Sequence, residues 1–127
     1  MTKYQFDHIH LYSPDPAKTA LFYQKMFGAR QVGSRQLPDG RTSIELDLNG
    51  TRLAVVKPPD QPAAAAAPGH GLDHFGLKTD SLEKAAAELK ANGVEFTVEP
   101  RAAGPGLKIS FLAAPDKVRI ELMERQA

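Results

Sequence analysis

The chain has 127 residues, no cysteine and a formal net charge of +1. This length fits one domain, or two very small halves that share a core. The near-neutral charge gives no electrostatic reason to expect nucleic acid or an anionic membrane as a partner, and no apolar run approaches the roughly 20 residues that span a bilayer. Without thiolates, any metal must be held by histidine and carboxylate. We expect a soluble cytoplasmic protein.

The first elements are a strand and a helix. A strand is predicted over residues 4–12, which are rich in β-favouring types. Side chains alternate between the two faces of a strand, so His8 and His10 share one face. After a turn, Asp15 caps a helix over residues 16–27. The residues expected to form the buried stripe of this helix are Leu21, Phe22 and Met26.

The rest of the first half is predicted to be β-structure. Asn49-Gly50 is a strong hairpin turn between two of its strands. The alternation of Ile44, Leu46 and Leu48 against Glu45 and Asp47 favours a sheet with one apolar face. The three strands are expected over residues 31–37, 43–48 and 51–57.

A linker is predicted over residues 58–71. It holds five consecutive alanines with prolines on both sides, too few alanines to maintain a helix alone. His70 falls in this linker and is expected to be exposed. The linker divides the chain into a first module, residues 1–57, and a second module, residues 72–127.

The second module repeats the order of the first. Asp80 or Ser81 caps its helix, Asn92-Gly93 closes it, and residues 100–106 form a loop. The side chains expected to face inward from this helix are Leu82, Ala86 and Leu89. The strands are expected over residues 72–79, 94–98, 107–112 and 118–123, and the helix over residues 82–92.

A short motif occurs in both modules. Phe6-Asp7-His8-Ile9-His10-Leu11 and Leu72-Asp73-His74-Phe75-Gly76-Leu77 share an apolar residue, then Asp, His, an apolar residue and a final Leu. A repeat of this kind has to be recognised before the fold is interpreted. We therefore expect two similar units, each ordered strand, helix, strand, strand, strand.

The repeat places chemistry-bearing residues at equivalent positions. The first strands contribute His8 and His74, and the last strands contribute Glu121 and Ala54. If a pseudo-twofold axis relates the modules, these positions face one shared cavity. Two imidazoles and one carboxylate suit a divalent first-row metal ion, and are typical of non-haem Fe(II) oxygenases.

Each of these residues also has an ordinary structural interpretation. A single histidine on a strand is more often hydrogen-bonded than ligating, and Glu121 could pair with Arg119. The repeat favours the metal, because a structural role would not require a histidine in both modules. His10, whose counterpart is Gly76, is a candidate acid/base catalyst, a partner of a ligand, or a spare ligand.

Together these motifs resemble the vicinal oxygen chelate superfamily, which includes glyoxalase I, methylmalonyl-CoA epimerase, extradiol dioxygenases and drug-resistance proteins. The resemblance covers nearly the whole chain. It implies an α+β fold of two βαβββ modules that form a cupped mixed β-sheet with the helices outside, often paired across a homodimer. It also implies that His8, His74 and Glu121 match three of four metal positions, and that the fourth falls on Ala54, which cannot coordinate.

Three functions remain open from the sequence. The three ligands match those of extradiol dioxygenases, so dioxygenase-like chemistry on Fe(II) is favoured, with Mn, Ni, Co or Zn as other candidate ions. A glyoxalase- or epimerase-like lyase or isomerase is the second reading, with water or another side chain in the fourth position. Glu45 is expected to be a poor replacement there. The third is a non-catalytic protein that sequesters a drug-like small molecule.

Overall fold

A computed structural model of the chain describes residue 3, residues 6–59, residue 72 and residues 74–126. Most of the predicted linker, including His70, lies outside the described residues. The chain divides into two compact units, residues 1–63 and residues 64–127, which we call unit 1 and unit 2. Among the described residues, no helix is long and apolar enough to cross a membrane.

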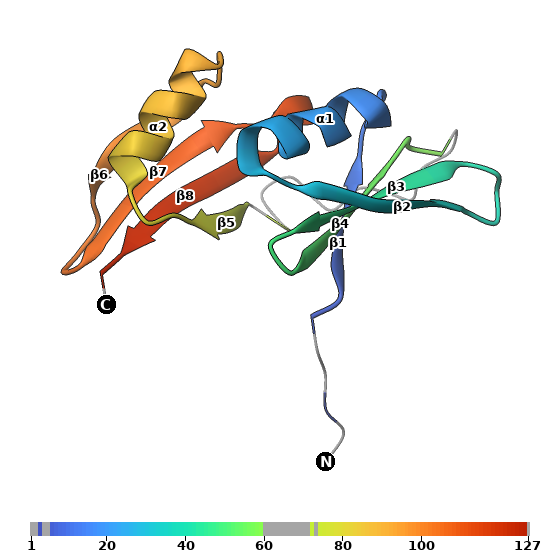
Figure 1. The fold of residues 1–127 in the computed structure, drawn as a ribbon, viewed down its shortest axis with the longest axis horizontal. Helices are drawn as coiled ribbons and strands as arrows, with labels where there is room; N and C mark the ends of the chain where they lie inside the picture. The colour runs from blue at the N-terminus through green and yellow to red at the C-terminus, as the bar shows by residue number, and fades with distance from the viewer. Residues whose placement is uncertain (1–2, 4–5, 60–71, 73, 127) are drawn as a thin grey trace. The chain divides into compact units, whose positions relative to one another are not determined.

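Unit 1 has the predicted strand-helix-strand-strand-strand order. Its sheet has the strand order β1-β4-β3-β2, in which β1 runs parallel to β4 and the other pairs are antiparallel. The helix α1 lies over one face of this sheet, where it packs on β3 and β4 (Figure 1). The elements are β1 (His8–Tyr12), α1 (Pro16–Phe27), β2 (Arg30–Gln36), β3 (Thr42–Leu48) and β4 (Thr51–Val56).

Local sequence signals explain where these elements begin and end. The Asp15 carboxylate accepts a hydrogen bond from the backbone N–H of Lys18 at 3.2 Å, which caps α1. At the tip of the β3–β4 hairpin, Asn49 and Gly50 have φ angles of 50° and 98°. Positive φ at both residues is what a two-residue hairpin turn requires, and Asn-Gly adopts it most readily.

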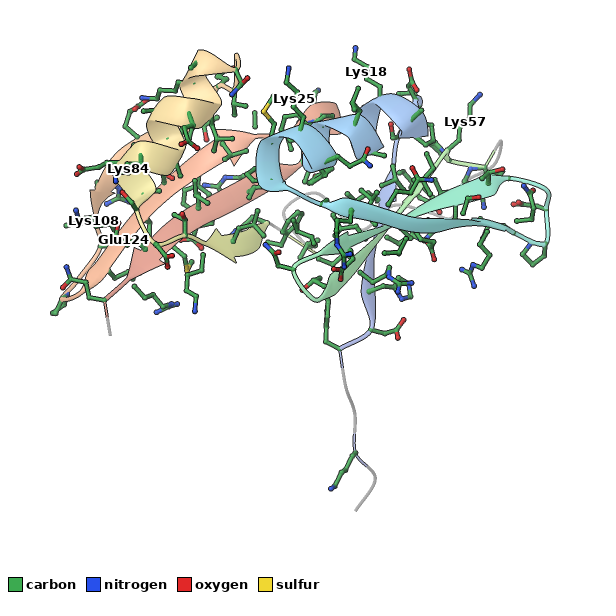
Figure 2. The ribbon with its side chains drawn as sticks, viewed as in Figure 1. Lys18, Lys25, Lys57, Lys84, Lys108 and Glu124 are labelled. Carbon is green, nitrogen blue, oxygen red and sulfur yellow. The ribbon has the colours of Figure 1, made fainter. Side chains whose placement is uncertain are left out.

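Unit 2 repeats the same topology with the strand order β5-β8-β7-β6, in which β5 is parallel to β8. The helix α2 lies over its sheet, and its first turn is tied to the last strand because the backbone N–H of Leu82 donates to Glu124 Oε1 at 2.8 Å (Figures 1 and 2). The elements are β5 (Phe75–Lys78), α2 (Leu82–Ala91), β6 (Phe96–Ala102), β7 (Leu107–Ala113), the short 3-10 turn η1 (Pro115–Lys117) and β8 (Arg119–Arg125).

The two cores are built alike, from the middle strands of each sheet. Leu46 and Leu53 are fully buried in unit 1, as are Leu112 and Ile120 in unit 2. Leu82, Ala86 and Leu89 are the buried residues of α2, as predicted. In unit 1 the side chains that alternate with the core residues form the polar face, which carries the histidines.

The predicted buried stripe of α1 was wrong. Leu21 is 61% exposed, whereas Thr19, Ala20 and Tyr23 are the buried residues of the helix. The helix is therefore rotated relative to the expected stripe. The Tyr23 ring fills the space over the sheet, and Ala20, one turn before it, allows the helix to approach closely.

The predicted loop over residues 100–106 begins too early. β6 continues through Pro100 to Ala102, with shifts in its register against β7. A proline is tolerated here because β6 is the edge strand of its sheet, where one backbone N–H per residue pair has no strand partner.

Candidate functional site

The central feature of unit 2 is a histidine–carboxylate pair. His74 lies just before β5, and Glu121 lies on β8, where its cross-strand partner on β5 is Gly76. His74 Nε2 and Glu121 Oε1 are 3.3 Å apart, and their side chains are 31% and 17% exposed. Two of the three predicted metal ligands are therefore brought together, in a position that is half-buried but accessible.

Phe111 supports this pair from the neighbouring strand. It is the cross-strand partner of Glu121, and the His74 ring meets its ring edge-on with 5.1 Å between centroids. The Arg119 guanidinium stacks on the same ring, 3.9 Å from its centroid. The aromatic ring thus restricts the orientation of the imidazole and places a cation near the pair.

The geometry of the pair fits a shared metal ion. Ligand atoms about 2.1 Å from one ion and at adjacent coordination positions lie about 3 Å from each other. The 3.3 Å separation of His74 Nε2 and Glu121 Oε1 is close to that value. No group of three or more His, Asp or Glu side chains gathers among the described residues, so the pair would need a further ligand.

His8, the third predicted ligand, belongs to unit 1. Its Nδ1 lies 2.7 Å from Asp7 Oδ2, at an exposed position. A carboxylate that accepts a hydrogen bond from one ring nitrogen fixes the tautomer and leaves the other nitrogen free to coordinate. The local arrangement of His8 is therefore that of a histidine prepared to bind through Nε2.

A second polar group lies on the same face of unit 1 as His8. His10 pairs across the sheet with Ala54, and Ala54 pairs with Glu45 on the next strand. Cross-strand partners place their side chains on one face, so His10 and Glu45 flank the small Ala54 side chain. The Ser43 hydroxyl donates to Glu45 Oε2 at 2.8 Å and fixes the carboxylate.

The structure shows which face of β3 carries Glu45, a point that the alternation of the sequence left open. Glu45 does point away from Ile44, Leu46 and Leu48, but that is the face that carries His10 and Ala54. The sequence contained the signal. A two-residue turn at Asn49-Gly50 fixes the hairpin register, and counting outward from it pairs Glu45 with Ala54.

The environment of His10 affects its proton affinity. Partial desolvation of the ring, then the nearby charges of His8 and Arg41, lower the pKa of His10 below its usual range, while Glu45 opposes them. The Tyr12 ring meets the imidazole edge-on with 5.3 Å between centroids. Tyr12 is itself 49% exposed on the polar face.

The fold and these side chains define a class of protein with two βαβββ units and a polar sheet face. A sequence profile of the Glyoxalase/Bleomycin resistance protein/Dioxygenase superfamily matches residues 5–122. The chain belongs to this superfamily, and the resemblance inferred from the repeated motif is confirmed.

Individual relatives agree with this assignment. The uncharacterised protein YwkD of Bacillus subtilis is 30% identical over 93% of this chain and 94% of its own length. The lactoylglutathione lyase GLX1 of Arabidopsis thaliana is 26% identical over 95% of this chain, which spans 44% of that enzyme. The crystal structure of a glyoxalase family protein from Enterococcus faecalis has a TM-score of 0.77 and 24% identity, over 94% of this chain and 97% of that one. The last similarity shows the fold.

Proposed function

We propose that the protein is a metal-dependent enzyme that binds neighbouring oxygens of a small-molecule substrate and moves a proton on it, as a lyase or isomerase does. The observation that supports this most is the 3.3 Å separation of His74 Nε2 and Glu121 Oε1. His8 is the third ligand in this proposal, because of the sequence repeat and its contact with Asp7. The modules pair within one chain or between the subunits of a homodimer.

The residues of unit 1 supply the proton chemistry in this proposal. A divalent ion, when bound, stabilises negative charge that develops on the substrate oxygens. The Glu45 carboxylate, oriented by Ser43, takes a proton from the substrate carbon. His10, on the other side of Ala54, holds or returns a proton at the neighbouring oxygen.

Two observations favour proton transfer over oxygen chemistry. Glu45 supplies a carboxylate directly across the sheet from Ala54, which has none. The similarity to a lactoylglutathione lyase also supports the lyase reading, although the chain spans 44% of that enzyme. Dioxygenase-like chemistry on Fe(II) remains the second candidate, because Ala54 leaves two histidines and one carboxylate as the set of ligands.

Metal analysis of the protein purified without chelator tests the proposal. We expect about one divalent ion per chain, lost in His8→Ala, His74→Ala and Glu121→Gln. Glu95→Gln is the matched control, because it removes an exposed carboxylate of unit 2 outside the site. Full metal content in the folded His74→Ala variant would contradict the site. Folded wild-type protein without metal would leave a binding protein instead of an enzyme.

Activity separates the two reactions. For proton transfer, Glu45→Gln should retain the metal and lose most of the conversion of glutathione and an α-ketoaldehyde to a thioester, or of the exchange of a substrate C–H proton in D₂O. For dioxygenase chemistry, bound iron and oxygen uptake with catechols are expected, and Glu45→Gln should have little effect on that uptake.

A further inference from the structure

Unit 2 contains an open cavity of about 480 Å³, and Arg119, whose guanidinium stacks on Phe111, is one of its lining residues. It lies between the ends of β6 and β7 and the turn that leads into β8. Its apolar wall comes from Val98, Leu112, Ala113 and Val118. A volume of this size is within the range of sites that bind small organic molecules.

The polar part of the lining consists of Thr97 and two cations. Lys117 ends the turn before β8, and Arg119 begins the strand. None of the described residues that line the cavity is acidic, and Asp116, the carboxylate of the same turn, is exposed and outside the lining. An apolar wall with two positive groups at one end complements a small molecule that has an apolar body and an anionic end.

Phe111 connects the cavity with the proposed metal pair. The Arg119 guanidinium stacks on the Phe111 ring, 3.9 Å from its centroid, and the His74 ring meets the same ring edge-on with 5.1 Å between centroids. Val98, in the cavity wall, is the cross-strand partner of Phe111. Arg119 and Glu121 are two residues apart on β8, so they share a face about 7 Å from each other.

We propose that this cavity binds the non-reacting end of the substrate, and that the substrate is a small organic acid whose carboxylate is held by Arg119 and Lys117. The planar guanidinium can form two parallel hydrogen bonds to a carboxylate, and the ammonium adds a second charge. The proposal deepens the proposed function and rests on it for the reacting end, which it assigns to His74 and Glu121.

Calorimetric titration of the full-length protein tests the cavity directly. The probes are 4-phenylbutanoate and its uncharged analogue 4-phenylbutanamide, which share an apolar body and differ in charge. We expect the acid to bind about tenfold or more tightly than the amide, because a charge-assisted hydrogen bond is lost in the amide. Arg119→Met should remove most of that difference, with the remainder due to Lys117, and leave the affinity for the amide nearly unchanged.

Arg125→Met is the matched control. Arg125 is exposed at the other end of β8, on the same side of the strand as Arg119, and its loss should not affect either probe. Arg119→Lys should retain part of the preference for the acid, because it keeps the charge without the planar fork. If Arg119→Met does not fold, Lys117→Met replaces it, with a smaller loss expected.

The outcomes distinguish this proposal from the proposed function. Equal binding of acid and amide, or equal losses in Arg119→Met and Arg125→Met, would overturn the acid-binding cavity even in protein that contains its metal. The folded wild-type protein could instead contain no metal when purified without chelator and still prefer the acid in a way that depends on Arg119. That result would support the acid-binding cavity and overturn the metal-dependent enzyme.

Discussion

In each sheet, three cross-strand partners on neighbouring strands form a row across the middle of the sheet, which we call the middle row. The two middle rows have the same backbone arrangement but carry their functional groups on different strands. In unit 1 the row runs from His10 to Ala54 to Glu45. In unit 2 the corresponding row runs from Gly76 to Glu121 to Phe111. Each row has one carboxylate, on the third strand position in unit 1 and on the second in unit 2. The two units therefore share one strand arrangement but place their carboxylates on different strands.

Side-chain size explains how the rows differ. A Cβ atom added at Gly76 would lie 3.9 Å from Glu121 Oε1 and 3.5 Å from the end of the Met123 side chain. A ring at position 76 would therefore take the space of the Glu121 carboxylate. In unit 1 the small Ala54 leaves room for the His10 ring. In each unit, a small residue therefore lies beside a large one on this face of the sheet: Gly76 beside Glu121 in unit 2, and Ala54 beside His10 in unit 1.

The largest expected effect tests whether the two cores are equivalent. Leu53→Ala and Ile120→Ala each remove a fully buried side chain from the middle strand of one unit. Each should lower the free energy of unfolding by about 2–5 kcal/mol, measured by urea denaturation. Arg52→Ala, an exposed change on the same strand as Leu53, should cost much less. A cost below about 1 kcal/mol for one core variant would show that its unit contributes little to stability.

The next prediction makes the middle row of unit 2 resemble that of unit 1. Gly76→His places the imidazole of unit 1 into unit 2 and should displace the Glu121 carboxylate from His74. We expect metal affinity to fall about 10- to 100-fold in a competition with a coloured chelator. Gly76→Ala is the control, because its Cβ would make ordinary van der Waals contacts. Unchanged affinity in Gly76→His would mean that Glu121 is not a ligand.

The reverse exchange introduces the carboxylate of unit 2 into unit 1. Ala54 is 3% exposed, so Ala54→Glu buries a charge beside Glu45. Without metal, this variant should be less stable than wild type by about 1–3 kcal/mol. Added metal should recover more stability in Ala54→Glu than in wild type, as thermal unfolding would show. Equal recovery in both proteins would place residue 54 away from the metal.

The sequence predicted the topology because its signals are local. Asp15, Gly28 and the Asn49-Gly50 turn each determine a boundary through their own backbone geometry. The packing face of α1 depends instead on which side chain fits the sheet. Leu21 therefore looked like a core residue from its type alone, yet Tyr23 occupies that place.

The site was predictable in part for the same reason. The repeat singled out His74 through its counterpart His8, and the last strand of the second module supplied Glu121; the two side chains lie 3.3 Å apart. Phe111 and Arg119 were missed as parts of the site, since their roles depend on stacking between side chains of different strands, which alternation along one strand does not show. The position of Glu45 beside Ala54 was not recognised, because alternation separates the two faces of a strand without showing which face carries His10 and Ala54.

The smallest effect compares the caps of the two helices. Asp15 accepts from the Lys18 N–H at 3.2 Å, whereas Ser81 accepts from the Lys84 N–H at a longer 3.4 Å. In unit 2, Glu124 also accepts from the first helical N–H, so Ser81 carries less of the capping.

We therefore expect Asp15→Ala to cost about 1 kcal/mol in the free energy of unfolding, and Ser81→Ala about 0.5 kcal/mol. Glu124→Ala should cost more than Ser81→Ala, because a charged acceptor near a helix N-terminus also interacts with the helix dipole. Urea denaturation of the three variants gives the ranking. If Ser81→Ala proved the most costly, the tie between Glu124 and α2 would contribute little, and the two helices would be held at their N-termini by the same kind of cap.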